Sequence, residues 1–199
     1  MIISHKHRFV FVKTHKTAGT SIEHSLIEHT DISDTVTGIP DNVVHPARNY
    51  HTPKGNYIEP HSSAEFILRE WPGLEDYVWF TVERHPYTKT VSAYHHVMRQ
   101  THYDPGVSNL DEFIDSDHMN LVNDAPLYTH DGEILVNGIL RYEHLEEDFA
   151  QLGNRLGLNL QLKYGLNRGK YTPVELSDSQ KNRIWQRCLP SLEYTGYDK

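Results

Sequence analysis

Residues 8–26, RFVFVKTHKTAGTSIEHSL, constrain the fold of this chain more than any other stretch. The run FVFV is aromatic and β-branched, which predicts a short buried strand. Ile22 and Leu26 then recur at helical spacing, and Thr20 with Glu23 matches a capping box. The stretch therefore predicts a strand, a loop of small residues and a helix that begins near Thr20.

The loop between that strand and that helix has the composition of an anion site. A strand–loop–helix unit directs backbone N–H groups and the positive end of the helix dipole at one spot. Lys16 adds a full positive charge, and neighbouring hydroxyl groups add hydrogen-bond donors. We expect a phosphate-like anion to bind here, although a strand–turn–helix that binds nothing would contain the same elements. The expected binding residues are Lys16, Thr17, Ala18, Gly19, Thr20 and Ser21.

The order of residues in this loop separates it from the nucleotide-binding loop of ATPases and GTPases. A Walker A loop places its lysine directly after a glycine, whereas Lys16 precedes Gly19. The run KTAGTS resembles the 5′-phosphosulfate loop of the sulfotransferases, which reads PKTAGTS in the carbohydrate-type branch, with His15 here at the proline position. The resemblance implies one sulfotransferase-like domain over residues 1–199. Its expected fold is a three-layer α/β fold with a parallel central sheet flanked by helices, P-loop-like at this loop.

A second strand and helix carry the second half of the resemblance. Residues 77–82, YVWFTV, predict a buried strand, and Pro86 suits the first turn of a helix. The following residues resemble the signature VRNPxxRxxSxY of the same family, with Arg84 and Ser92 in register. The resemblance implies that these two side chains hold the 3′-phosphate of the donor 3′-phosphoadenosine-5′-phosphosulfate (PAPS), a group that a guanidinium binds in bidentate fashion. A strand-end salt bridge and a solvent-facing serine are the alternatives.

The chain departs from this second signature at three positions. Glu83 stands where the family has valine, His85 replaces asparagine, and Lys89 replaces arginine. Lys89 keeps the positive charge but lacks the planar fork of a guanidinium. A weaker third match, RYEHLEEDF at residues 141–149, is similar to the family segment RYENLxxDF, and residues 194–197 echo the closing segment of family members.

Sulfuryl transfer to a hydroxyl group needs charge stabilisation and a general base. The resemblance implies that Lys16 stabilises the leaving oxygen. We predict His61 as the base, because Ser62 and Glu65 match a capping box and a helix N-terminus disfavours imidazolium. Glu65 and His15 are alternative bases. A loop at residues 165–171, with Arg168 and Lys170, is expected either to close over the nucleotide or to be plain surface.

The remaining sequence predicts further alternation of strands and helices, which favours a parallel α/β sheet. Residues 30–60 lack a period and are expected to form long loops. Ser177 with Gln180 is expected to cap a last helix that ends by Pro190. The other predictions are helices at 62–71, 109–115 and 145–156, a hairpin within 127–136 and a strand at 138–142.

Composition limits the possible partners. A formal net charge of -8 argues against a general nucleic-acid binder. Cys188 is the single cysteine, so no intramolecular disulfide forms. No signal-peptide core and no apolar run long enough for a bilayer is present, so we expect a cytoplasmic protein without membrane contact. The 15 histidines show no metal-ligand spacing, and no metal is expected.

The expected activity is therefore PAPS-dependent sulfation of a hydroxyl group, with 3′-phosphoadenosine-5′-phosphate (PAP) as the product. A saccharide is the first choice of acceptor because the closest motif forms belong to the carbohydrate-type branch. A lipid, a peptide tyrosine and a small metabolite are alternatives. A catalytically silent nucleotide-binding module and a P-loop nucleotide kinase-like protein are the competing functions.

Overall fold

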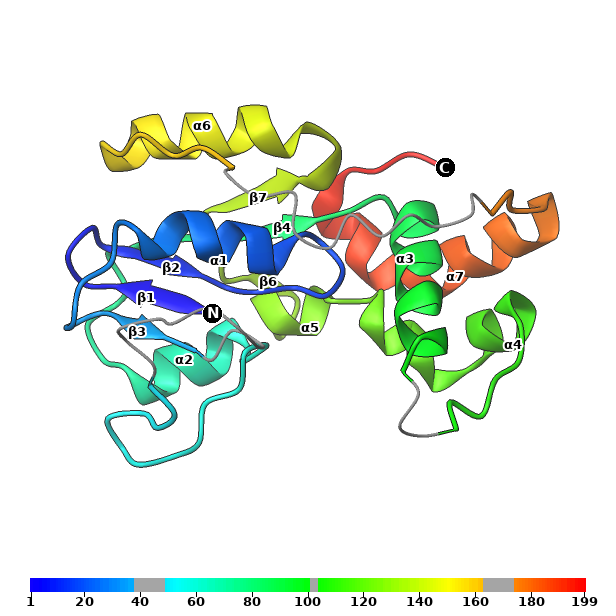
Figure 1. Cartoon of the computed structure of the whole chain (residues 1–199), viewed down its shortest axis with the longest axis horizontal. Helices are drawn as coiled ribbons and strands as arrows, with labels where there is room; N and C mark the ends of the chain where they lie inside the picture. Colours follow the sequence, from blue (N-terminus) through cyan, green and yellow to red (C-terminus); the bar gives the residue numbers. More distant parts are fainter. Residues whose placement is uncertain (38–48, 101–103, 163–173) are drawn as a thin grey trace.

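The computed structural model describes residues 1–37, 49–100, 104–162 and 174–199, which form an α/β fold around a five-stranded sheet (Figure 1). The strand order is β3-β1-β2-β4-β7. The strands β2, β4 and β7 are parallel to one another, whereas β1 is antiparallel to both β2 and β3. The parallel centre was predicted, but the sheet as a whole is mixed. The strands are β1 Ile2–Ser4, β2 Phe9–Phe11, β3 Thr35–Val36, β4 Val78–Glu83 and β7 Gly138–Arg141.

The two antiparallel strands were not predicted from the sequence. β3 lies within residues 30–60, which were expected to be loops only, and that part of the prediction is wrong. Both strands are too short to show an alternating pattern of their own. They form because β1 pairs on one side with β2 and on the other with β3, so cross-strand contacts determine the structure rather than local propensity.

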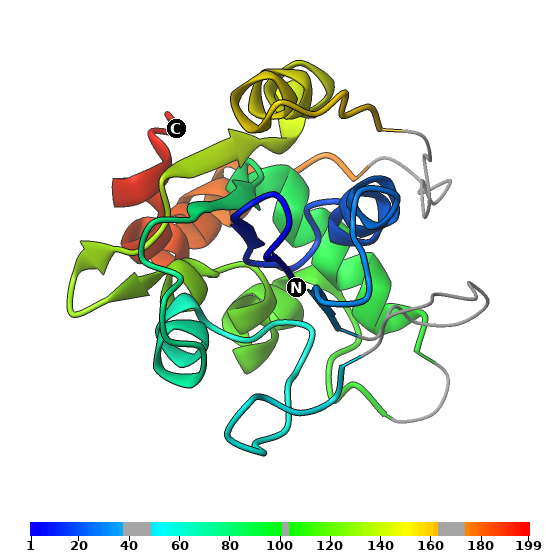
Figure 2. The same cartoon turned by 90° about the vertical axis from the view of Figure 1, so that its left-hand side faces the viewer.

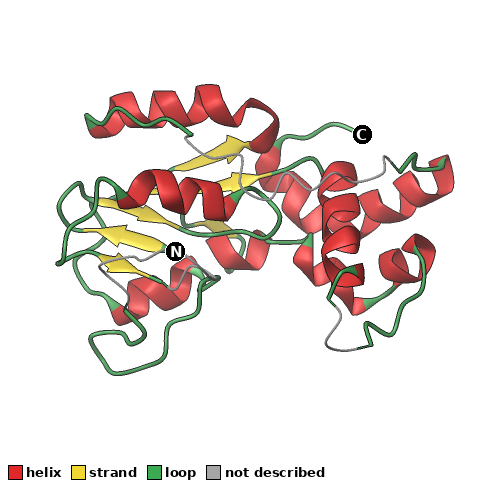
Figure 3. Cartoon of the chain, viewed as in Figure 1, coloured by secondary structure: helices red, strands yellow, loops and turns green. Residues whose placement is uncertain are grey.

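Helices cover both faces of the sheet, as Figures 2 and 3 show. Successive side chains of a strand point to opposite faces, so the runs FVF and VWFTVE each supply both cores. One face packs against α1 (Gly19–Ile27) and α6 (Leu145–Leu156). The other packs against α2 (Ala64–Glu70) and the short α5 (Ala125–Tyr128). The predicted arrangement of helices on both sides of the sheet is confirmed for the described residues.

A group of helices lies beyond the carboxyl ends of the parallel strands (Figure 1). It consists of α3 (Pro86–Met98), α4 (Leu110–Asp115), the 3₁₀ helix η1 (Asp117–Leu121) and α7 (Asp178–Thr195). These helices share a third apolar core that includes Ala93, Phe113 and Ile184. This group borders the edge of the sheet at which ligands of parallel α/β folds bind.

Two local predictions have different outcomes. The hairpin is confirmed as β5 (Thr129–His130) and β6 (Glu133–Ile134), whose turn residues have positive φ angles as a type I′ turn requires. The capping box at the start of α7 is also confirmed, but the predicted end of this helix by Pro190 is wrong. The helix continues to Thr195, and Ser191, directly after Pro190, is buried and accepts the N–H of Ala125 (3.2 Å).

Candidate functional site

The loop between β2 and α1 has the backbone shape of an anion-binding concavity. Lys16 and Ala18 have positive φ angles of 58° and 64°, with a negative φ at Thr17 between them. Such an alternation turns successive N–H groups toward one point, as in phosphate-binding loops. Each non-glycine residue in the left-handed region costs about 1–3 kcal/mol. Two such residues within three positions therefore mark a loop that its surroundings hold in a defined shape.

The first turn of α1 opens onto this loop. The helix begins at Gly19 after Ala18, and no side chain caps its N-terminus. The first N–H groups of a helix have no partner within the helix, so they and the positive dipole end remain for an anion. The predicted capping box of Thr20 and Glu23 is wrong, and its loss leaves the helix end open to a ligand.

Glu23 turns into the core instead, because two ammonium groups attract it there. Its carboxylate contacts Lys13 Nζ at 2.6 Å and the amino group of Met1 at 2.7 Å. Burial opposes its ionisation, but the two cations outweigh burial and hold the pKa of Glu23 below its usual range. The stem of Lys13 also explains Gly19, since a Cβ there would lie 2.9 Å from Lys13 Cγ.

Lys16 is the loop lysine with a charge available to a ligand. Lys13 is neutralised by Glu23, whereas no acidic side chain pairs with Lys16 within the described part of the chain. Burial and the nearby guanidinium groups of Arg99 and Arg84 lower the pKa of Lys16 to about 8. Cations gathered in this way attract a polyanion, which in turn stabilises the charged form of each.

The hydroxyl groups of the loop are not all turned outward. The Thr17 hydroxyl is buried and contacts the Thr14 hydroxyl at 2.9 Å, so Thr17 faces a ligand only through its backbone. Ser21 is also buried, while Thr20 in the first turn of α1 is half-buried.

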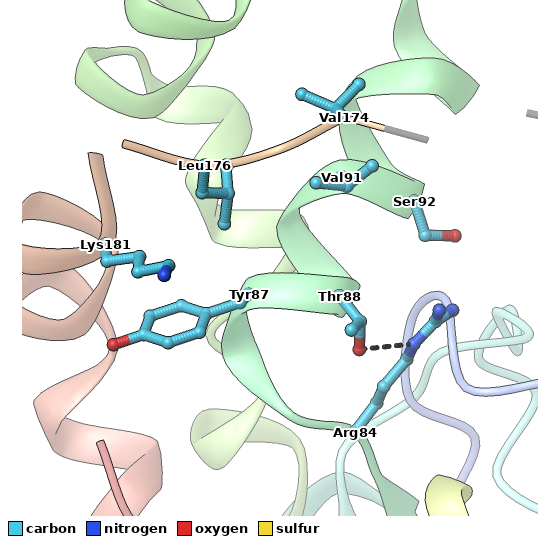
Figure 4. A pocket seen from close by; sticks show the side chains of 8 residues that line it. All are labelled: Arg84, Tyr87, Thr88, Val91, Ser92, Val174, Leu176 and Lys181. Atoms are coloured by element: carbon cyan, nitrogen blue, oxygen red, sulfur yellow. Dashed lines mark hydrogen bonds between the residues drawn. The ribbon is translucent and has the colours of Figure 1, made fainter. Parts of the chain in front are cut away.

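Arg84 and Ser92 lie together on the second strand–helix unit. Arg84 follows β4 directly, and its Nε donates to Thr88 Oγ1 at 3.0 Å. Figure 4 shows its guanidinium and the Ser92 hydroxyl on the same side of α3. A pocket of about 380 Å³ lies beside them. Its walls are Arg84, Tyr87, Thr88, Val91, Ser92, Val174, Leu176 and Lys181.

The two motif regions are in direct contact. Arg84 Nη1 donates to the carbonyl oxygen of Lys16 at 3.4 Å, although the two residues are 68 positions apart. The third motif joins them, because the Tyr142 ring lies 4.1 Å from the guanidinium carbon of Arg84. Near the C-terminus, the Tyr197 hydroxyl donates to Glu143 at 2.6 Å. All four segments singled out in the sequence therefore meet at the carboxyl edge of β4 and β7.

The departures from the second signature have structural explanations. His85 is the N-cap of α3, and its Nδ1 accepts the N–H of Tyr87 at 3.3 Å, a capping role for which asparagine is also suited. Glu83 and Lys89 are buried and form an ion pair of 2.7 Å with each other. Lys89 is therefore part of the scaffold and does not face the pocket beside Arg84.

A third charge completes this buried cluster. Lys89 Nζ contacts Asp124 at 2.8 Å, and both side chains are almost fully buried. Burial opposes the charge of Lys89, but Asp124 and Glu83 outweigh burial and raise its pKa. Asp124 lies before α5 and also binds His15, through the backbone N–H at 2.7 Å and through Nδ1 at 2.6 Å. The cluster thus connects the anion-binding loop to α3.

His61 lies against the same loop. Its Nδ1 contacts the carbonyl oxygen of Lys13 at 2.9 Å, so this nitrogen carries the hydrogen and Nε2 is left to accept a proton. Burial and the neighbouring His15 lower the pKa of His61 to about 4. The ring stacks on that of His15, with centroids 3.9 Å apart. His61 is thus neutral near pH 7, the state that a general base requires.

The capping residue of the predicted helix beside His61 is one residue later than expected. Ser63 caps α2 by accepting the N–H of Phe66, so the predicted capping box of Ser62 and Glu65 is wrong. Ser62 instead bonds to Glu59. Glu65 is 45% exposed and pairs with Arg69 at 3.5 Å, which places this alternative base on the surface.

Sequence reasoning missed two residues of this site. Asp124 gave no signal because 109 positions separate it from His15, and Arg99 lies outside the second signature. Helical spacing could have indicated Arg99, because it follows Ser92 by seven residues, or two turns of α3. Arg168 and Lys170, which were predicted to bind the nucleotide, lie outside the described residues.

Comparisons of the chain with protein-family models, curated proteins and solved structures found no match. In the described ranges, every helix is too short or too polar to cross a bilayer. The same residues contain no group of three or more histidine, cysteine or acidic side chains placed to hold a metal ion.

Proposed function

We propose that this protein is a PAPS-dependent sulfotransferase with a P-loop-like donor site. One observation carries the proposal: Arg84 and Ser92 line one pocket, and the Arg84 guanidinium reaches the Lys16 loop. Two segments that resemble donor-binding motifs separately thus form one continuous site. This site lies outside the carboxyl ends of parallel strands, where ligands of such sheets bind.

The pocket suits the nucleoside part of the donor and its 3′-phosphate. Tyr87, Val91 and Leu176 supply an apolar wall for a purine ring. Arg84 and Ser92 at the edge of this wall supply the charge and the hydrogen bond for a phosphate. Hydrogen bonding to Thr88 and stacking on Tyr142 hold the guanidinium in place before any ligand arrives.

The loop suits the 5′ end of the donor. The N–H groups of residues 16–21 and the open end of α1 would bind the 5′-phosphate, and Lys16 would stabilise negative charge on the leaving oxygen. The donor supplies the sulfuryl group, whose sulfur–oxygen bond to the 5′-phosphate breaks as an acceptor hydroxyl oxygen attacks in line. His61 Nε2 takes the proton of that hydroxyl.

A saccharide hydroxyl is our first choice of acceptor, on the strength of the carbohydrate-type loop sequence. A cytoplasmic location belongs to the same proposal, because Cys188 is the single cysteine and is a buried free thiol. The catalytically silent module would share the donor site. Mass-spectrometric detection of sulfate transfer to a panel of saccharides distinguishes it from an active enzyme.

Calorimetric titration with PAP tests the donor site directly. Adenosine-5′-phosphate, and ATP with Mg²⁺, are the comparison ligands, and the variants are Arg84→Ala, Lys16→Ala and the exposed control Arg155→Ala. A charge-assisted hydrogen bond contributes about 1.5–3 kcal/mol, so Arg84→Ala should weaken PAP binding by about 10–150-fold. It should leave adenosine-5′-phosphate nearly unaffected, because that ligand lacks the 3′-phosphate. A preference for ATP with Mg²⁺, or equal affinity for both monophosphates, would contradict the proposal.

A further inference from the structure

His15 occupies the proline position of the loop pattern, and the structure gives this side chain a defined orientation. The buried carboxylate of Asp124 accepts both its backbone N–H (2.7 Å) and its ring Nδ1–H (2.6 Å). Lys89 fixes Asp124 from the other side at 2.8 Å. The side chain of His15 is 25% exposed, whereas that of Asp124 is 1% exposed. The His15 ring is thus held in place by a buried carboxylate and is still accessible to solvent.

The carboxylate determines which nitrogen is free. Burial opposes ionisation of Asp124, but Lys89 and His15 outweigh burial and keep its pKa below its usual value. An ionised carboxylate only accepts hydrogen bonds, so Nδ1 of His15 must carry a hydrogen. Nε2 is then the ring atom left for a ligand. Because Nδ1 already donates to Asp124, Nε2 becomes a donor only when the ring carries a second proton.

His61, which stacks on His15, has a different hydrogen-bond partner. His61 bonds through Nδ1 to a neutral carbonyl, and no carboxylate among the described residues hydrogen-bonds to its ring. Two parallel imidazoles with centroids 3.9 Å apart repel one another if both are charged. Burial and the neighbouring His15 lower the pKa of His61 to about 4, so His61 stays neutral near pH 7.

We propose that His15 is a further anion-binding residue of the donor loop, which takes up a proton when the nucleotide binds and donates Nε2–H to its 5′-phosphate. The inference rests on the proposed function of the loop. The groups that face His15 are Asp124 before α5, Lys89 and His96 from α3, His61 before α2 and the adjacent Lys16. Because Nδ1 donates to Asp124, Nε2 can donate to an anion only on the doubly protonated ring, so proton uptake should accompany binding.

Calorimetry of PAP binding in two buffers of different ionisation enthalpy measures this proton uptake. We expect the wild type to take up part of a proton near pH 7.5 and to lose about tenfold in affinity between pH 6.5 and 8. His15→Gln should take up fewer protons on binding PAP. Its affinity for PAP should vary less with pH, and at pH 6.5 it should already be as low as that of the wild type at pH 8. Titration of the nucleotide's own phosphates is common to both proteins and cancels in the comparison. The exposed His144→Gln is the matched control and should follow the wild type.

A second measurement is an NMR titration of the His15 ring in the wild type, with and without PAP. The ring signals of His15, assigned by their loss in His15→Gln spectra or by labelling, should report a higher pKa in the PAP complex than in the free protein. Equal proton uptake by wild type and His15→Gln, or an unchanged pKa of the His15 ring, would overturn this inference alone. Absence of PAP binding to the wild type would overturn the proposed function together with it.

Discussion

The stacked position of His61 leads to a prediction about stability and pH. Burial and the neighbouring His15 lower the pKa of His61 from 6.5 to about 4. Between these two values the unfolded chain binds a proton at His61 and the folded chain does not. The free energy of unfolding therefore rises with pH across this window, and stability is lost as pH falls from about 6.5 toward about 4. Replacement by glutamine removes this part of the pH dependence.

The size of the effect follows from the shift. One pKa unit corresponds to about 1.4 kcal/mol, so the full shift corresponds to about 3 kcal/mol. We expect about 2 kcal/mol, because His61 is only half-buried and solvent screens part of the effect. Glutamine keeps a side-chain N–H that can donate to the carbonyl of Lys13, so His61→Gln tests titration with little loss of hydrogen bonding.

Urea unfolding followed by intrinsic fluorescence at about pH 7 and pH 4.5 measures the difference. The wild type should lose about 2 kcal/mol more than His61→Gln on acidification. Carboxylate titrations contribute to both proteins and cancel when the two are subtracted. The exposed His144→Gln should behave as the wild type does. An equal loss of unfolding free energy in the wild type and His61→Gln would show that the surroundings do not hold the His61 ring neutral. His61 would then not be a base that is ready near pH 7.

Two further substitutions test the scaffold around the site. Lys89→Met leaves two buried carboxylates without their lysine partner and should lower the free energy of unfolding by about 3–5 kcal/mol. In thermal circular dichroism this corresponds to a melting temperature lower by about 6–20 °C. A drop under about 3 °C would contradict a buried charge cluster. Gly19→Ala forces the Lys13 stem to move and should cost about 1–3 kcal/mol in urea unfolding. Its control is Gly138→Ala, where a Cβ has no neighbour within 4 Å, and equal costs at the two glycines would refute the packing argument.

The parts of the fold that could be predicted are those with a strong local pattern. The strands β2, β4 and β7 are short apolar runs between turn residues, and α6 has an apolar stripe that the sequence marks clearly. The site could be placed because parallel strands share a carboxyl edge, which brings the residues after β2 and β4 together. Neighbouring positions in the sheet thus made Lys16 and Arg84 neighbours in space.

The missed parts depend on contacts between distant segments. β1 and β3 have no pattern and are strands only because of their partners. Glu23 has the spacing of a capping residue, yet buried ammonium groups attract it more strongly than a helix end does. Asp124 supports His15 from 109 positions away, a pairing that no local reading of one sequence reveals. Electrostatic partners inside the protein are set by the fold, not by spacing along the chain.

The ion pair between Glu83 and Lys89 has a consequence for how such signatures are compared. Scored one position at a time, the glutamate and the lysine count as two separate mismatches. In the structure the two positions are linked, because Lys89 lies between Glu83 (2.7 Å) and Asp124 (2.8 Å) and is the cation for both carboxylates. A glutamate at position 83 therefore depends on the cation at position 89, whereas Lys89 keeps Asp124 as a partner even without Glu83. A search that scores the pair jointly would treat chains of this kind as self-consistent variants instead of eroded ones.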